Sequence, residues 1–120
     1  MTRLLLAVLI AIQIAPAARA EGASRIAERE EFVRLIQGRA LTRLGITLTV
    51  TPDGAITGRA FGTPVKGAWR WQGGLFCRDL FFGDEDLGPN CQVVERRGDT
   101  LRFIADEGRG DYADLRLKKP

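Results

Sequence analysis

The sequence of 120 residues contains no histidine, only two cysteines and a single methionine. Histidine is the commonest general base and the commonest metal ligand, so its absence excludes Ser-His and Cys-His nucleophilic sites. No G-x-G-x-x-G stretch lies between a strand pattern and a helix pattern, which leaves dinucleotide binding without support. We therefore expect no metal and no cofactor, and we favour a protein that is not an enzyme.

Long apolar runs are also missing, except near the N-terminus. There, Arg3 precedes the apolar residues 4–12, and Ala18-Arg19-Ala20 places small residues at the two positions that a signal peptidase reads. The apolar run is shorter than the about 20 residues of a membrane-spanning helix. We predict a signal peptide over residues 1–20, cleavage after Ala20, and a periplasmic or secreted protein without membrane contact after cleavage.

The charge of the mature chain is close to zero. Arg3 and Arg19 would leave with the signal peptide, so 18 basic residues become 16, against 15 acidic ones. Nucleic-acid binding needs a clustered basic face, and here both signs are interspersed along the sequence. We expect no nucleic-acid partner. Residues 21–120 are enough to form one hydrophobic core, which predicts a single domain. We also expect a monomer.

Cys77 and Cys91 are the only cysteines. An even number of cysteines in an exported protein predicts a disulfide. The chain-entropy model gives such a bond about 3 kcal/mol of stabilisation. The alternative, a redox-active pair, lacks the two-residue spacing of thioredoxin-like sites.

One helix is expected, over residues 24–37. Ser24 can cap its start, Phe32 and Ile36 lie on one face at helical spacing, and Gly38 can end it. From residue 45 onward the apolar pattern changes to a period of two, which is typical of half-buried strands. Seven strands are expected, at residues 46–50, 55–61, 65–72, 75–82, 91–95, 100–105 and 112–117.

Short turns join these strands. Pro52-Asp53-Gly54 is a turn sequence, and Gly73-Gly74 between two strand patterns indicates a two-residue hairpin. Residues 83–90 are expected to form an acidic, solvated loop. We predict an all-β fold, an antiparallel up-and-down meander that forms a small, closed or half-closed, lipocalin-like barrel with one N-terminal helix. Closure would remove exposed strand edges.

The predicted hairpin WRWQGGLFCRD, residues 69–79, contains both tryptophans. A turn at Gly73-Gly74 pairs Trp69 with Arg78 and Trp71 with Phe76, and puts these four side chains on one face of the sheet. In a ligand-binding barrel they would form an aromatic wall with one cation, suited to an anionic or aromatic small molecule. Alternatively, the aromatic side chains fill the core and Arg78 stacks on Trp69 near a barrel end.

Three stretches carry a resemblance to a known group: LTVTPDG, GAWRWQGGLFCRD and NCQVVERRGDTLRF. The mature chain resembles small exported bacterial proteins of unknown function, whose members are often labelled dihydrodipicolinate reductase. That label implies a cytosolic, nicotinamide-dependent enzyme of lysine synthesis with a dinucleotide-binding domain. The predicted signal peptide, the missing glycine fingerprint and the short chain argue against this activity.

Together, these features favour a non-catalytic binding protein for a small molecule or for a periplasmic protein partner. A second hypothesis is an inhibitor of a periplasmic hydrolase, because such inhibitors are also small disulfide-bonded β domains. A third is an enzyme that uses only carboxylates. Its acid–base candidates would be Asp84, Glu85, Asp86, Asp106 and Glu107.

Overall fold

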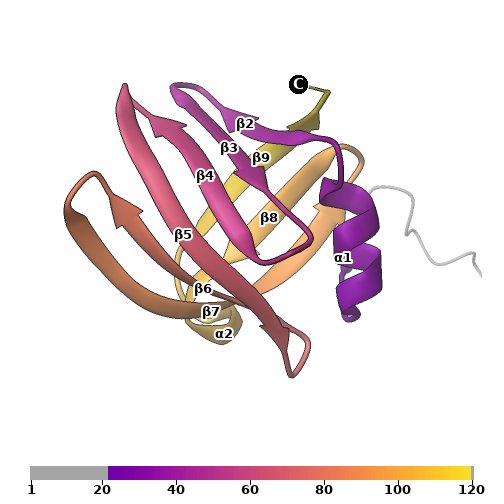
Figure 1. Cartoon of the computed structure of the whole chain (residues 1–120). Helices are drawn as coiled ribbons and strands as arrows, with labels where there is room; N and C mark the ends of the chain where they lie inside the picture. The colour runs from indigo at the N-terminus through magenta and orange to yellow at the C-terminus, as the bar shows by residue number, and fades with distance from the viewer. Residues whose placement is uncertain (1–21, 120) are drawn as a thin grey trace, which may run out of the picture.

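The computed structural model describes residues 22–119, so the predicted signal peptide and its cleavage site lie outside the described residues. Its elements are β1 (Ser24–Arg25), α1 (Arg29–Ile36), β2 (Ala40–Arg43), β3 (Ile46–Val50), β4 (Ala55–Ala60), β5 (Thr63–Gln72), β6 (Leu75–Phe82), β7 (Glu85–Arg97), β8 (Thr100–Ile104), α2 (Ala105–Gly108) and β9 (Tyr112–Lys118). Strands β2 to β9 form a closed antiparallel barrel of eight strands (Figure 1). The predicted all-β barrel is confirmed.

Each barrel strand pairs with the next in the sequence, and β9 pairs with β2 to close the ring. Most of the connections are two-residue turns that contain glycine with a positive φ. Such turns match the twist of antiparallel strands, and glycine adopts a positive φ at no steric cost. They lie at Leu44-Gly45, Phe61-Gly62, Gly73-Gly74, Gly83-Asp84 and Gly98-Asp99.

The helix is shorter than predicted, because it begins at Arg29 rather than at residue 24. Ser24 does not cap it but pairs with Arg96 of β7 in the short strand β1. The Ile26 N–H extends this pairing with a 2.9 Å hydrogen bond to the Val94 carbonyl. An edge of β7 left open beyond the end of β6 therefore overrides the local preference of these residues for a helix.

Two strand predictions also needed correction. Residues 40–43 form β2, whose four residues are too few to display a clear alternation. Most of the predicted loop 83–90 belongs to β7, since Phe82 pairs with Glu85 and Phe81 with Asp86. Acidic residues disfavour strands on their own, but the tight turn at Gly83-Asp84 places them directly opposite β6.

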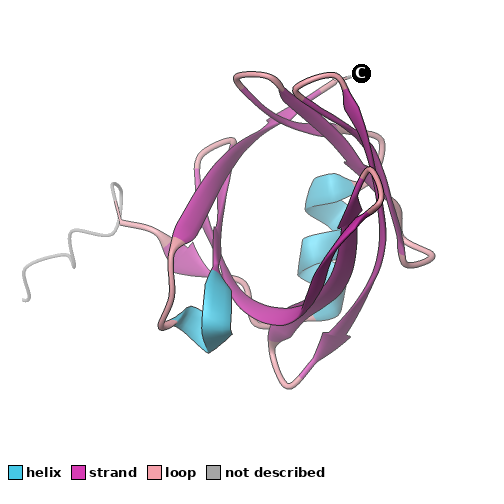
Figure 2. Ribbon diagram, turned by 90° about the vertical axis from the view of Figure 1, so that its left-hand side faces the viewer, coloured by secondary structure: helices cyan, strands magenta, loops and turns pink. Residues whose placement is uncertain are grey.

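Helix α1 covers one end of the barrel. Figure 2 looks along the barrel, and α1 is visible through the ring of strands. Phe32, fully buried, extends from α1 into this end, where Arg29 also donates a 2.6 Å hydrogen bond to the Pro52 carbonyl in the β3–β4 turn. The core continues from here along the inward-facing positions of the strands and includes Val50, Ile56, Val94, Leu101, Leu115 and Leu117.

Candidate functional site

The predicted hairpin at residues 69–79 has the expected register. Trp69 pairs with Arg78 and Trp71 with Phe76 across the Gly73-Gly74 turn, as do Arg70 with Cys77 and Gln72 with Leu75. Because side chains alternate along a strand, Trp69, Trp71, Phe76 and Arg78 share one face. That face is the interior of the barrel, since Trp69 and Phe76 belong to the buried core.

The two tryptophans lie at the end of the barrel that α1 covers. The Phe32 ring is 5.2 Å from the Trp69 ring and 5.1 Å from the Trp71 ring, between centroids. Trp69 Nε1 donates a 2.8 Å hydrogen bond to the Thr51 carbonyl, and Trp71 Nε1 donates one of 2.9 Å to the Ala27 carbonyl. Both indole N–H groups are thus satisfied within the protein, and both rings pack against the helix.

The expected stacking of Arg78 on Trp69 is wrong. The guanidinium over the Trp69 ring belongs to Arg29 of α1, whose Cζ is 5.4 Å from the ring centroid. Arg29 reaches this position because the helix crosses the barrel end at which Trp69 lies. Arg78 instead donates a 2.8 Å hydrogen bond from Nη1 to the Gly88 carbonyl of β7.

A cavity of about 340 Å³ occupies the other part of the barrel interior. This volume lies near the lower end of the range for small-molecule sites, about 300–1,000 Å³. The cavity reaches the surface at Arg43, Asp111 and Tyr112, which are exposed. Phe76 and Arg78 line it, whereas Trp69 and Trp71 do not; its other apolar walls include Ile46, Leu48, Leu80, Phe103 and Leu115.

Arg78 is the partly buried cation of this cavity wall, whereas Arg43 is exposed at the mouth. Partial burial lowers the pKa of its guanidinium, and the nearby charge of Asp79 partly opposes this effect. Asp79 follows Arg78 on the strand and therefore points to the opposite, solvent-exposed face. Within residues 22–119, the ion pairs are Arg102–Asp114 and Arg109–Glu107, so Arg78 has no carboxylate partner there. Arginine stays protonated despite such a shift, and the wall therefore carries a partly desolvated positive charge.

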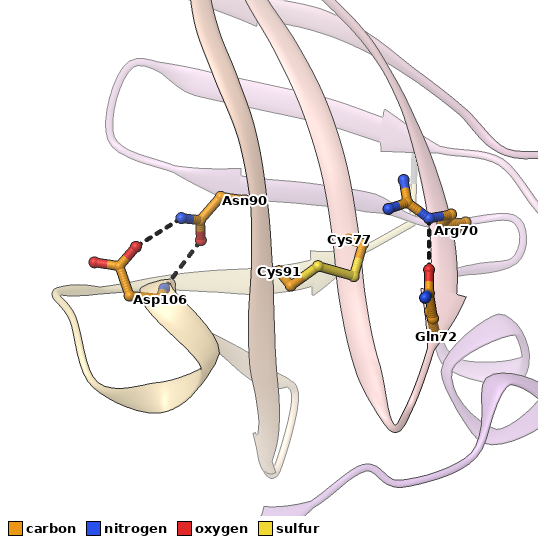
Figure 3. Close-up of a disulfide and its surroundings, with 6 residues drawn as sticks. All are labelled: Arg70, Gln72, Cys77, Asn90, Cys91 and Asp106. Atoms are coloured by element: carbon orange, nitrogen blue, oxygen red, sulfur yellow. Dashed lines mark hydrogen bonds between the residues drawn. A yellow bond between two sulfur atoms is a disulfide. The ribbon is translucent and has the colours of Figure 1, made fainter.

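The predicted disulfide joins Cys77 of β6 to Cys91 of β7, which are direct partners in the register (Figure 3). Cys91 lies inside β7 and not at the end of a loop as predicted. The bond therefore links two neighbouring strands. Both cysteines alternate with the inward residues Phe76 and Arg78, so the bond lies on the outer side of the barrel.

The acidic residues considered for catalysis lie outside the cavity. Asp84, Glu85 and Asp86 are exposed at the β6–β7 turn. Asp106 and Asn90 form two reciprocal hydrogen bonds (Figure 3). Asn90 Nδ2 donates a 2.8 Å hydrogen bond to the Asp106 carboxylate, and the Asp106 backbone N–H donates one of 3.1 Å to Asn90 Oδ1. This pair anchors the start of α2 to β7. No group of three or more potential metal ligands occurs in the part of the chain that the structure describes.

Sequence reasoning identified Phe76 and Arg78 but missed the remaining walls, such as Leu48, Leu80 and Leu115. The sequence feature that marks these wall residues as inward-facing is the apolar alternation with a period of two, which also predicts the strands. Alternation separates inward from outward residues but does not tell which inward residues the helix covers.

The fold and the cavity define the class: a small, closed, antiparallel β-barrel whose interior is packed at one end and hollow at the other. No family model, curated protein or solved structure matches the chain. Across residues 22–119, no helix is long and apolar enough to span a bilayer.

Proposed function

We propose that this protein is a non-catalytic binding protein of the periplasm or extracellular space that holds a small amphipathic anion in its barrel cavity. We also propose that residues 1–20 are a signal peptide, which is cleaved off when the protein is exported. The observation that best supports ligand binding in the cavity is the partly buried guanidinium of Arg78 in an otherwise mostly apolar wall.

The Arg78 side chain suits an anionic head group. A guanidinium has five N–H donors in a planar fork that matches a carboxylate, phosphate or sulfonate. One Arg78 nitrogen, Nη1, donates to the Gly88 carbonyl, and this is its one hydrogen bond to residues 22–119. Partial burial removes part of the electrostatic stabilisation that water gives to the Arg78 charge, and a bound anion would restore some of it. The site therefore favours an anionic over a neutral ligand.

The aliphatic and phenylalanine walls suit an apolar tail. Transfer of apolar surface from water into such a cavity contributes about 25 cal/mol per Å². The volume of about 340 Å³ corresponds to roughly eleven water molecules at about 30 Å³ each. The proposed ligand is therefore a medium-chain fatty acid or a small aromatic acid rather than a whole phospholipid.

The test compares decanoate with decanol, which has the same tail and no charge. Binding to the purified chain is measured by displacement of the fluorescent anion anilinonaphthalene sulfonate. We expect decanoate to bind more tightly than decanol, and Arg78→Gln to weaken decanoate about 10- to 100-fold, the loss of one or two charge-assisted hydrogen bonds. Decanol binding should not change.

Arg70→Gln is the matched control. Arg70 lies in the same β5–β6 hairpin, opposite Cys77, but its side chain is exposed on the outer face and donates a hydrogen bond to Gln72. This variant should bind decanoate like the wild type. Equal losses for the Arg78 and Arg70 variants, or no displacement by decanoate, would contradict the proposal.

A further inference from the structure

The barrel separates the two signs of charge, although the mature chain as a whole is nearly neutral. Residues 38–78, which run from β2 into β6, carry six basic residues and one acidic residue, Asp53. Residues 79–114 carry ten acidic and four basic ones. Asp53 lies in the β3–β4 turn, at the end that α1 covers. Of the six basic residues, Arg43, Arg59 and Lys66 lie toward the cavity end of β2 to β5, which is therefore basic. The two counts also correct the expectation that both signs are interspersed along the sequence.

Two apolar side chains project from this basic part. Leu44 is 95% exposed at the β2–β3 turn, and Phe61 is 73% exposed at the β4–β5 turn. The turns are adjacent: the Phe61 N–H donates a 2.7 Å hydrogen bond to the Gly45 carbonyl, and a Cβ added to Gly45 would meet the Phe61 ring. We call Leu44 and Phe61 the apolar tips.

Phe61 has a φ of +52°, in the left-handed region. A bulky residue is uncommon there, and Asn, Asp or Gly fits such a turn better. The phenylalanine is thus unfavourable for the local backbone, and its exposed ring contributes little to the core. Strained residues of this kind cluster at functional sites.

Basic groups flank the apolar tips on the side of β2 and β9. On the other side the acidic β6–β7 turn borders the Phe61 turn, since the Gly83 N–H donates a 2.8 Å hydrogen bond to the Pro64 carbonyl. Arg43 precedes Leu44, and Arg59 Nη1 donates a 2.7 Å hydrogen bond to the Gly62 carbonyl in the Phe61 turn. A shallow hollow beside Leu44 is lined by Arg43 together with Arg116 and Lys118 of β9. The carboxylate in this hollow, Asp114, is already paired with Arg102 at 2.8 Å.

We propose that the apolar tips dock this protein on an anionic phospholipid bilayer. Projecting side chains match a bilayer interface, which accepts them without a preformed pocket, and the cations beside Leu44 match phosphate head groups. Arg43 lines both the hollow and the cavity mouth, so docking would turn the mouth toward the lipid. The proposal departs from the expectation of no membrane contact and does not depend on ligand binding in the cavity.

The test is flotation with vesicles of phosphatidylcholine, with or without phosphatidylglycerol. The chain used begins at residue 21, because the apolar residues 4–12 could bind vesicles themselves and the described core lies between Ile26 and Leu117. We expect flotation with the anionic vesicles and much less with phosphatidylcholine alone. Phe61→Asn should reduce the partition coefficient at least about tenfold, because it removes a buried aromatic ring from the complex.

Phe61→Asn separates docking from folding, since asparagine tolerates a positive φ. Its thermal midpoint should equal or exceed that of the wild type. Arg116→Gln should reduce partitioning into anionic vesicles about fivefold, the contribution of one cation near such a surface. Leu87→Ser is the matched control: Leu87 is 50% exposed, but in the acidic part of the barrel, and its replacement should have no effect.

Other results would overturn the proposal: no flotation, equal flotation with both vesicle types, or an equal loss for Leu87→Ser. Light scattering without vesicles tests a second copy of the chain as the occupant, and a dimer that Phe61→Asn dissociates would also overturn it. Arg78→Gln should leave flotation unchanged, so failure of the cavity proposal and failure of this one are distinguishable.

Discussion

The two ends of the barrel interior differ although the same strands build both. At the covered end, Phe32 lies among Trp69, Trp71, Phe76 and Phe103, with ring centroids 5.1–6.4 Å from its own. At the other end, mostly apolar side chains line a cavity together with two arginines, Arg78 in the wall and Arg43 at the mouth. Helix α1 fills one end, and residues 22–119 contain no equivalent of it at the other.

This comparison teaches that an inward position on a strand is not by itself a core position. Trp69 and Arg78 are paired and both face inward, yet the tryptophan is 6% exposed in the core and the arginine lines the cavity. An apolar side chain without a packing partner leaves room for a ligand. We expect substitutions at the two ends to differ accordingly.

The largest difference is expected for removal of a large side chain. Phe32→Ala should lower the free energy of unfolding by about 3–5 kcal/mol, because Phe32 is fully buried among aromatic rings. Leu80→Ala should cost clearly less, since Leu80 is only partly buried and already faces the cavity. Urea denaturation measures both, and equal losses would remove the proposed difference between the ends.

A smaller difference in the free energy of unfolding is expected when a leucine is replaced by phenylalanine at each end of the barrel interior. Leu101→Phe should cost about 1–3 kcal/mol, because Leu101 is fully buried and the larger ring must displace packed neighbours. Leu48→Phe should cost less than about 1 kcal/mol and weaken decanoate binding, because its ring can enter the cavity. Urea denaturation and dye displacement test the pair; a Leu48 variant as unstable as the Leu101 variant would indicate that the cavity is filled in solution.

The smallest effect on stability is expected for the ion pair between Arg102 and Asp114. Arg102 lies on the outer face and, unlike Arg78, has a carboxylate partner. The Arg102 hydrogen bond lowers the pKa of Asp114, so the stabilisation from this pair is present above the usual aspartate value, about 3.9. It is lost as the pH falls through the lowered pKa. Asp114→Asn should therefore be slightly less stable than the wild type at pH 7 and no less stable at a pH below the lowered pKa of Asp114. Both groups are partly exposed, so the loss at pH 7 should be small.

Most of the barrel was predictable because its local signals agree. The alternation of Ile46, Leu48 and Val50 and the turn at Gly73-Gly74 predicted strands and a hairpin register that the structure confirms. The disulfide was predictable because Cys77 and Cys91 are the only cysteines. The errors fell where long-range pairing decides, as at Ser24, where the free edge of β7 replaces the expected helix cap.

The candidate site was only half predictable. The sequence by itself determined which side chains face inward, because a strand alternates with a period of two and Trp69, Trp71, Phe76 and Arg78 follow that period. Only the tertiary structure decided that α1 covers the two tryptophans and leaves Arg78 beside a cavity. The physical reason is that burial depends on what packs against a face, and α1 reaches its place through contacts with residues 23 to 71 positions further along the chain, from Pro52 to Phe103.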